Sequence, residues 1–348
     1  MSNRPKAAAL ISGGLDSLLA AKVLLEQGVQ VEGINFYTGF CVEGHTHAIR
    51  KKDKAKPKRN NALWSAEQLG IPLHIIDVIE EYKNVLINPK HGYGANMNPC
   101  LDCKGFMVKK ALEWIKENNF DFIITGEVMG QRPMSQRKDT MPIIAKESGA
   151  NDLLLRPLCA KLLPETLPEI NGWVDREKLY GFNGRTRKPQ MALAEKFGFK
   201  EYAQPAGGCC FLTDKNYSER LVDLWQARDD NKNYELDDIM LLKVGRHIRP
   251  KEYFKLIIGR EEGENKFLEG YRSQFVHLKT TSCVGPLALI EGRLQDEDLE
   301  TAAKVVARFS KDRNEESVTV EVTQKDGVSQ SLNVTPFKEY ELPESWLI

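Results

Sequence analysis

The stretch AAALISGGLDS, residues 7–17, decides the fold. Its apolar run, 7–11, is too short for a membrane span or a signal-peptide core and is typical of a buried strand. Gly13 and Gly14 then allow a tight turn, and a helix is expected from Ser17 onward. A strand, a glycine turn and a helix in this order turn several backbone N–H groups toward an anion. The stretch therefore predicts a phosphate-binding loop.

Four further apolar runs follow the first, with helical stretches between them. This alternation predicts a parallel sheet with crossover helices, and nearly all-apolar strands indicate helices on both faces. The predicted strands are 7–11, 31–36, 73–78, 122–125 and 153–156, and the predicted helices are 17–27, 61–69, 105–118 and 135–148. We expect a doubly wound α/β domain whose ligands lie beyond the carboxyl ends of the strands.

The remaining residues indicate a second, smaller domain, and the 348 residues are enough for two. Pro, Gly and charged residues predominate over 158–214 around one helix at 189–197, which indicates a segment wrapping over the ligand edge. A helix at 217–228 follows, and the polar stretch 229–235 is the best candidate for a boundary. The expected strands 239–244, 254–258, 287–294, 317–322 and 331–334 and the helix 297–309 make the last third an α+β module. The predicted division is a nucleotide domain at 1–160, a wrapping segment at 161–230 carrying a cysteine site, and a C-terminal module at 235–348.

Charge and hydropathy limit the classes of partner that the sequence predicts. Lys plus Arg and Asp plus Glu both number 49, so attraction to nucleic acid must come from local patches. The densest basic block lies at 45–59, at the ligand edge, and is either a solvated loop or a contact for RNA phosphates. Smaller groups extend it: Arg132, Arg137 and Lys138, then Arg185, Arg187 and Lys188. No apolar run approaches the roughly 20 residues of a membrane span, so a cytoplasmic protein without a membrane partner, its thiols reduced, is expected.

Side chains in the loop suit a nucleotide. Ser12 and Ser17 can donate hydroxyl groups, and Asp16 can hold the Mg²⁺ that a nucleotide carries. The alternative is an ordinary turn with Ser17 capping the helix. SGGLDS resembles the PP-loop of the ATP pyrophosphatases, which split ATP into AMP and pyrophosphate. The resemblance implies that ATP binds to Ser12, Gly13, Gly14, Asp16 and Ser17.

A second resemblance narrows the family. Residues 125–127, 130–131 and 135–136 resemble the TGExxGQ and SQ motifs of tRNA 4-thiouridine synthetases, and 155–158 resemble their LRPL. This implies thiolation of a tRNA uridine, with Gly126 and Gln131 beside the nucleotide. That family usually carries RNA-binding modules ahead of the loop, whereas here the loop starts close to residue 1. We therefore expect another part of the chain to capture tRNA.

Two pairs of cysteines indicate sulfur chemistry. Cys100 and Cys103 form a CxxC motif just before an expected helix, and Cys209 and Cys210 follow two glycines. The two segments resemble the catalytic-cysteine regions of tRNA 2-thiouridine synthetases. Cys41, Cys159 and Cys283 lack partners at metal spacing and are expected to be core residues.

The cysteine pattern leaves two routes of sulfur transfer open. Cys100, Cys103 and Cys210, with Cys209 as the alternative third ligand, resemble the sites of PP-loop thiolases that hold three irons of a [4Fe–4S] cluster and leave the fourth for sulfide. The other route uses a persulfide on one cysteine and a second thiol that resolves the disulfide. A structural zinc site is a third alternative.

The C-terminal module resembles a known RNA-binding domain. Residues 241–247, 257–260 and 264–265 are similar to the RNA-binding domain of the NFACT ribosome-quality-control proteins. This implies RNA contacts by Arg246, Arg249 and Arg260. The alternative is a structural domain in which these arginines pair with the nearby glutamates of 261–264.

These features predict an ATP-dependent tRNA sulfurtransferase whose chemistry rests on Asp16, Cys100, Cys103 and Cys210. A uridine oxygen, O4 in the favoured version or O2, attacks the α-phosphorus, and sulfur from sulfide or a persulfide carrier then displaces AMP. The loop supplies charge and orientation, and no histidine stands out as a general base. Two alternatives stay open: amidation of a small acid with ammonia, and a non-catalytic RNA-binding protein with a relic nucleotide domain. The sequence leaves the oligomeric state open.

Overall fold

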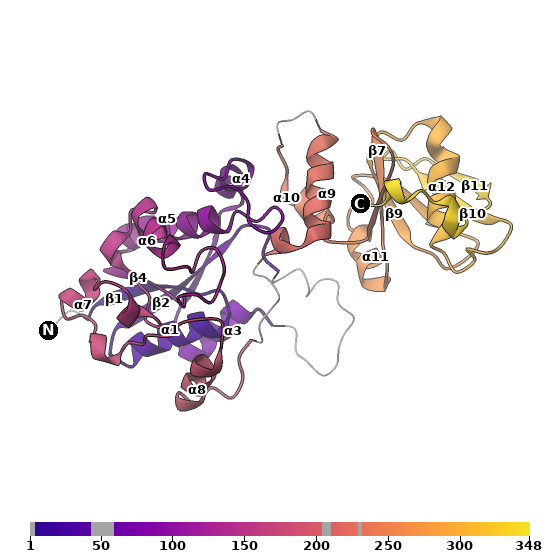
Figure 1. Ribbon diagram of the computed structural model, residues 1–348. Helices are drawn as coiled ribbons and strands as arrows, with labels where there is room; N and C mark the ends of the chain where they lie inside the picture. Colours follow the sequence, from indigo (N-terminus) through magenta and orange to yellow (C-terminus); the bar gives the residue numbers. More distant parts are fainter. Residues whose placement is uncertain (1–3, 43–58, 204–209, 229–231) are drawn as a thin grey trace. The chain divides into compact units, whose positions relative to one another are not determined.

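The computed structural model describes residues 4–42, 59–203, 210–228 and 232–348. The described residues form two compact units, one up to Thr213 and the other from Asp214 onward (Figure 1). Residues 45–58 of the basic block, and Cys209, lie outside the described residues. No helix within the described ranges has the length and apolar character needed to cross a membrane.

The first unit is an α/β domain built on five parallel strands in the order β3-β2-β1-β4-β5. The strands are β1 (Lys6–Leu10), β2 (Gln30–Tyr37), β3 (Leu73–Asp77), β4 (Phe122–Thr125) and β5 (Leu154–Leu155). The helices are α1 (Leu15–Leu25), α3 (Asn61–Leu69), α4 (Ile79–Ile87), α5 (Cys100–Asn118), α6 (Thr140–Glu147), α7 (Leu167–Ile170) and α8 (Lys188–Lys196). The predicted doubly wound sheet is confirmed.

Helices cover both faces of this sheet, as the apolar strands predict (Figure 1). Ala7 and Ala9 on β1 point to the core formed with α1, α3 and α8, whereas Ala8 points to the core formed with α5 and α6. Successive residues of a strand face opposite sides of the sheet, so the central strand needs small apolar residues throughout. The wrapping segment contributes Val174 and Leu193 to the first of these cores and so packs with the first unit.

Several helices differ from the prediction. Helix α6 begins at Thr140 and not at Ser135, so residues 135–139 belong to the loop after β4. Helix α5 begins at Cys100 and not at Gly105, so the CxxC motif forms its first turn instead of preceding it. Helix α4 was not predicted, because it follows β3 without a glycine or proline break. The side chain of Asp77, the last residue of β3, accepts a hydrogen bond from Ile79 N at 2.9 Å and starts the helix.

The second unit is an α+β domain, as predicted, with a six-stranded antiparallel sheet in the order β11-β10-β8-β9-β7-β6. The strands are β6 (Arg246–Lys251), β7 (Phe254–Ile258), β8 (Val276–Thr280), β9 (Leu287–Gly292), β10 (Val318–Thr323) and β11 (Ser329–Val334). The helices are α9 (Lys215–Gln226), α10 (Leu236–Leu241), α11 (Glu262–Glu269) and α12 (Leu299–Arg308). Helix α12 covers one face through Leu256 and Ile258, and α10 and α11 pack near Ile257 on the other.

The predicted strand at 239–244 is wrong, because most of it lies in helix α10 and the turn after it. Apolar periodicity alone does not separate a short buried helix from a strand. The residues at the start of this segment favour the helix over the strand. Glu235 and Asp238 form a capping box, with Glu235 N donating to Asp238 Oδ2 at 2.8 Å.

Candidate active site

The loops after β1 and β4 are neighbours at one edge of the sheet. Leu10 on β1 lies opposite Thr125 on β4, so the residues that follow them emerge side by side. The strand order also reverses between β1 and β4, since β2 and β3 extend to one side and β5 to the other. Ligands of doubly wound sheets bind at such a switch point. The two motifs predicted to bind ATP therefore meet where the fold favours a ligand.

The loop itself has the geometry of an anion-binding turn. Gly13 has a φ of +77°, and a Cβ there would lie 2.7 Å from Asn61 Cβ and Ala62 N, so only glycine fits. The first hydrogen bond inside α1 runs from Leu18 N to Gly14 O at 3.2 Å. The N–H groups of 15–17 precede that bond and are not used by the helix, which leaves the helix start suited to phosphate.

The two predicted serines lie together beside this turn. Ser12 is exposed and its Oγ lies 3.3 Å from the Oγ of Ser17, which is buried. Ser17 Oγ also donates to Gly14 O at 2.8 Å. The hydroxyl groups thus line the turn, although Ser17 does not cap the helix, since Gly14 is the N-cap residue.

Gly126 is pressed against the loop. A Cβ on Gly126 would lie 2.4 Å from Ser17 N and within 2.6 Å of the Asp16 carbonyl group. Contacts this short are not tolerated between backbone and side chain, so this position requires glycine. The motif after β4 therefore sets the position of the loop after β1.

Asp16 is held by a chain of two glutamines. Gln131 Nε2 donates to Asp16 Oδ2 at 2.7 Å, and Gln190 Nε2 donates to Gln131 Oε1 at 2.8 Å. Gln190 is fully buried and belongs to α8 in the wrapping segment. The other carboxylate oxygen, Asp16 Oδ1, is buried without a hydrogen-bond partner among the described residues, and Arg187 Nη2 lies 3.9 Å from it. A buried carboxylate oxygen in this position fits a Mg²⁺ ion carried by a nucleotide.

Glu127 is a buried structural residue and not part of the open site. Its Oε2 accepts hydrogen bonds from Arg156 Nε at 3.0 Å and Thr125 Oγ1 at 2.9 Å. Burial acts to raise the pKa of Glu127, but the positive charges of Lys104 and Arg156 and the hydrogen bonds hold this pKa below its usual value. The TGE and LRPL motifs are thus joined by a buried ion pair.

The cysteine segments predicted to cooperate are neighbours in the structure. Cys210 Sγ donates to Asn98 Oδ1 at 3.9 Å, and Asn98 lies two residues before Cys100. Asn96 Nδ2 donates to Thr213 O at 2.9 Å. Cys100 Sγ donates to Ser135 Oγ at 3.6 Å, which brings α5 to the loop after β4. Cys100, Cys103 and Cys210 are all partly exposed.

The described positions give no support to the predicted [4Fe–4S] cluster. Over the described ranges, no three His, Cys, Asp or Glu side chains come close enough to hold a metal ion. Cys100 and Cys210 instead approach Ser135 and Asn98, and the alternative ligand Cys209 lies outside the described residues. The described structure therefore does not support the set Cys100, Cys103 and Cys210 as metal ligands.

Cys41 is a residue that sequence reasoning missed. It was expected in the core, but it is only half-buried and forms an isolated antiparallel bridge with Cys210, next to the hydrogen bond from Phe211 N to Phe40 O at 2.9 Å. Its position after β2, at the ligand edge, was the available signal. Cys159, in contrast, is buried, and burial raises the pKa of its thiol to about 12. Cys283 packs against the core of the second unit.

Some of the residues predicted to contact RNA are exposed, and others pair with carboxylates or aromatic rings of the protein. Arg132, Arg137, Lys138, Arg185 and Lys188 are exposed, and Arg137 pairs with Asp139 at 2.9 Å. Arg59 lies over the Trp64 ring, 3.2 Å from its centroid.

In the second unit, Arg249 is bound to Asp223 through two hydrogen bonds of 2.5 and 2.8 Å, and Arg260 pairs with Glu264 at 3.3 Å. Arg249 is thus a poor candidate for RNA. Arg246 instead lies over the Phe309 ring, 4.8 Å from its centroid.

Fold and site define a doubly wound α/β domain with a glycine turn at its switch point, followed by an α+β domain. Residues 5–148 match the tRNA methyl transferase HUP domain family, and residues 245–347 match the NFACT protein RNA binding domain family. Both predicted resemblances, to the PP-loop tRNA thiolases and to the NFACT domain, are confirmed.

Curated relatives agree with the first match. The chain is 25% identical over 216 residues to a tRNA-specific 2-thiouridylase of Dehalococcoides mccartyi, covering 61% of this chain and 56% of the relative. It is 27% identical over 272 residues to one of Petrotoga mobilis, covering 76% and 69%, respectively. It is 29% identical to one of Phocaeicola vulgatus, covering 44% and 40%. The chain thus spans between two fifths and about 70% of the length of these relatives.

A solved structure is also similar. A 4-thiouridine synthetase in complex with RNA and bound ATP matches with a TM-score of 0.41 and 21% identity, covering 61% of this chain and 46% of that one.

Proposed function

We propose that this chain is an ATP-dependent tRNA sulfurtransferase. The observation that carries the proposal is the meeting of Asp16, Gly126 and Gln131 at the switch point of the sheet, where ATP and Mg²⁺ would bind. The relatives are named for thiolation of tRNA at uridine position 2. We therefore favour 2-thiouridine as the product over the 4-thiouridine favoured by sequence motifs.

In the first step, the uridine carbonyl oxygen attacks the α-phosphorus of ATP, and pyrophosphate leaves. The N–H groups at the start of α1 would hold the phosphates, and Asp16 Oδ1 would hold the Mg²⁺ that neutralises the leaving pyrophosphate. Gln131 keeps the second oxygen of this carboxylate in place. The protein's contribution is orientation and charge, without a general base.

In the second step, we favour the persulfide route. Terminal sulfur on one cysteine attacks the adenylated carbon, and AMP leaves with the oxygen. A second thiol then attacks the cysteine sulfur, so that the thiocarbonyl leaves and a protein disulfide forms. Cys100 and Cys210 are the pair for this step, because their segments meet at Asn98. A persulfide carrier supplies the sulfur, and an external thiol reduces the disulfide.

The test is a thiolation assay with unmodified tRNA, ATP, Mg²⁺ and a persulfide donor, with digested nucleosides identified by mass spectrometry. We expect 2-thiouridine from the wild type, none from Asp16→Asn, Cys100→Ser or Cys210→Ser, and an unchanged yield from Cys283→Ser. Asp16→Asn should also lose tRNA-dependent pyrophosphate release, whereas the cysteine variants keep it. Thiolation by Asp16→Asn would contradict the proposal.

The same preparations separate the alternatives. Iron and acid-labile sulfide that copurify anaerobically and disappear in Cys100→Ser would favour the cluster route over the persulfide. A 4-thiouridine product would restore the sequence-based preference. Pyrophosphate release that needs a small acid and ammonia but no tRNA would favour the amidating enzyme, and no release at all would favour the RNA-binding protein.

A further inference from the structure

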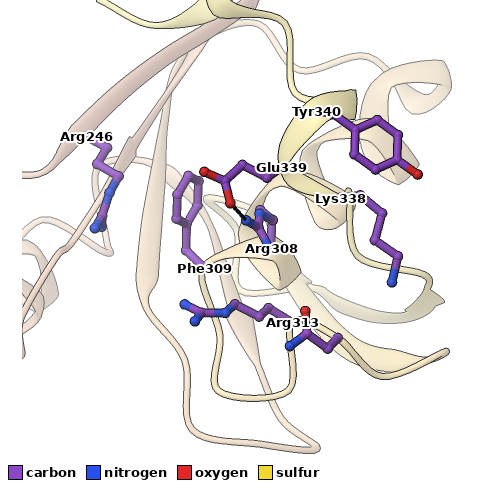
Figure 2. Close-up of a pocket in the computed structure, with 8 residues that line it drawn as sticks. Arg246, Arg308, Phe309, Arg313, Lys338, Glu339 and Tyr340 are labelled. Carbon is purple, nitrogen blue, oxygen red and sulfur yellow. Dashed lines mark hydrogen bonds and ion pairs between the residues drawn. The ribbon is translucent and has the colours of Figure 1, made fainter.

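The second unit contains a cavity of about 560 Å³ that the proposed chemistry does not use (Figure 2). This volume lies within the range of roughly 300–1,000 Å³ of small-molecule sites. The walls come from the first residue of β6, the end of α12 with the loop after it, and the segment after β11. The lining residues are Arg246, Arg308, Phe309, Arg313, Asn314, Lys338, Glu339 and Tyr340.

The charge of this cavity favours an anion. Three arginines and a lysine line it, against the single carboxylate of Glu339. Burial first, and then the nearby charge of Arg260, lower the pKa of Arg246, and the charge of Glu264 provides only partial compensation. An anion that entered the cavity would add to that compensation.

The carboxylate that lines the cavity is easily displaced. Arg308 Nη2 pairs with Glu339 Oε2 at 3.2 Å, as Figure 2 shows, but the Glu339 side chain is 92% exposed. An ion pair with so exposed a partner contributes little to stability. By contrast, the buried cation of Lys255 in the same unit has two carboxylate partners. Its Nζ lies 3.0 Å from Asp223 Oδ2 and 3.2 Å from Glu291 Oε2.

Aromatic rings accompany the cations. Phe309 lies under the Arg246 guanidinium group, and Tyr340, 86% exposed, projects at the rim of the cavity (Figure 2). A large exposed aromatic side chain next to several cations is the combination with which proteins hold single-stranded nucleic acid, the phosphate on the cations and the base on the ring.

We propose that this cavity binds an unpaired nucleotide of RNA, with a phosphate on Arg308 and Arg313 and the base against Tyr340. The proposal rests on the proposed function in that the RNA is the tRNA substrate. It assigns the RNA contact to Arg308, Arg313 and Tyr340, together with Arg246 from the sequence-based set, and withdraws it from Arg249. Glu339 occupies the phosphate position until RNA displaces it.

The test is fluorescence anisotropy of a short labelled oligouridylate, and of unmodified tRNA, with the full chain over a series of salt concentrations. Arg313→Glu should weaken binding about tenfold and lower the slope of log K against log salt by about 0.7. Tyr340→Ala should weaken binding with an unchanged salt slope, and Glu339→Gln should tighten it. Arg293→Glu reverses an exposed charge outside the cavity and is the matched control, with unchanged affinity expected.

Equal affinity in all variants, or a loss in Arg293→Glu as large as in Arg313→Glu, would overturn the cavity as the RNA site. Free UMP that competes as well as the oligonucleotide would also overturn it in favour of a nucleotide site. Thiolation by the wild type with unaltered KM for tRNA in Arg313→Glu leaves the proposed function intact while this inference fails. Conversely, if Arg313→Glu loses RNA binding but the wild type does not thiolate tRNA, the cavity is the RNA site and the proposed function fails.

Discussion

Gln131 holds Asp16 across 115 positions of sequence, its Nε2 donating to Asp16 Oδ2 at 2.7 Å. The bond joins the loop after β4 to the first turn of α1. Gln190 extends it into the wrapping segment. The Asp16 carboxylate, to which we assign the Mg²⁺, is thus oriented by residues from two other parts of the first unit.

Gln131→Leu removes this donor, and we expect it to lower kcat/KM for ATP in tRNA-dependent pyrophosphate release by tenfold or more. A hydrogen bond to a charged group contributes about 1.5–3 kcal/mol, which corresponds to that range. Gln27→Leu is the control, because Gln27 accepts a bond of 2.8 Å from Asp175 N near the far end of α1. An equal loss in both variants would show a general effect on α1 and not a role at Asp16.

Gly126→Ala should abolish ATP binding while the chain still folds, because the added Cβ would displace the backbone of Asp16 and Ser17. Gly105→Ala is the matched glycine variant. It lies inside α5, where a Cβ meets nothing within 4 Å, so the change should stabilise by about 0.5–1 kcal/mol. Equilibrium binding of a fluorescent ATP analogue and thermal unfolding measure the two effects. Unaltered ATP binding by Gly126→Ala would contradict the placement of the loop.

Arg156→Met should destabilise the first unit by about 3–5 kcal/mol, since it leaves the Glu127 carboxylate buried without its main partner. The double variant Glu127→Gln, Arg156→Met should recover much of this loss, because no buried charge remains. Denaturant unfolding of the three proteins measures the difference. Equal stability of the single and double variants would mean that the ion pair is not the source of the effect.

His247 predicts acid sensitivity of the second unit. Burial first, and then the charges of Lys255 and Arg220, hold the pKa of His247 well below its usual value, so the folded form stays neutral. The unfolded chain takes up the proton below about pH 6.5, so stability is lost as the pH falls from there, by up to about 1.4 kcal/mol per pH unit. Hydrogen exchange of the β7 amides between pH 7 and 5 reports on this unit. His247→Gln should flatten the dependence, and an unchanged slope would assign it to other groups.

Much of the first unit is predictable because its local patterns agree with its tertiary packing. The strand at 122–125 and the helix at 61–69 have the predicted bounds, and each is set by apolar pattern with clear turns around it. The C-terminal elements are harder. Strand β6, with three basic residues and Pro250, carries no strand pattern. Its Arg249 is accommodated by tertiary contacts, with Asp223 of helix α9, Glu252 O and Glu291 as partners.

For the site, motifs predicted which loops meet, but not the side chains that connect them. Gln190 has no motif of its own, and its bond to Gln131 depends on how the wrapping segment packs. The cysteine spacing predicted a cluster, whereas the positions of Asn98 and Ser135 beside the thiols depend on tertiary contacts that spacing does not contain.

The segment of Cys210 is attached to its surroundings by the bond from Phe211 N to Phe40 O and by the one from Asn96 Nδ2 to Thr213 O, both away from the strands of the sheet. In the proposed reaction, activation of the oxygen and delivery of the sulfur would therefore rest on different segments of the unit, which approach each other where Cys100 Sγ lies 3.6 Å from Ser135 Oγ. Changes in residues 210–213 would then alter the proposed sulfur transfer while the loop after β1 stays intact. An enzyme built in this way can diversify its second reaction during evolution without losing its first.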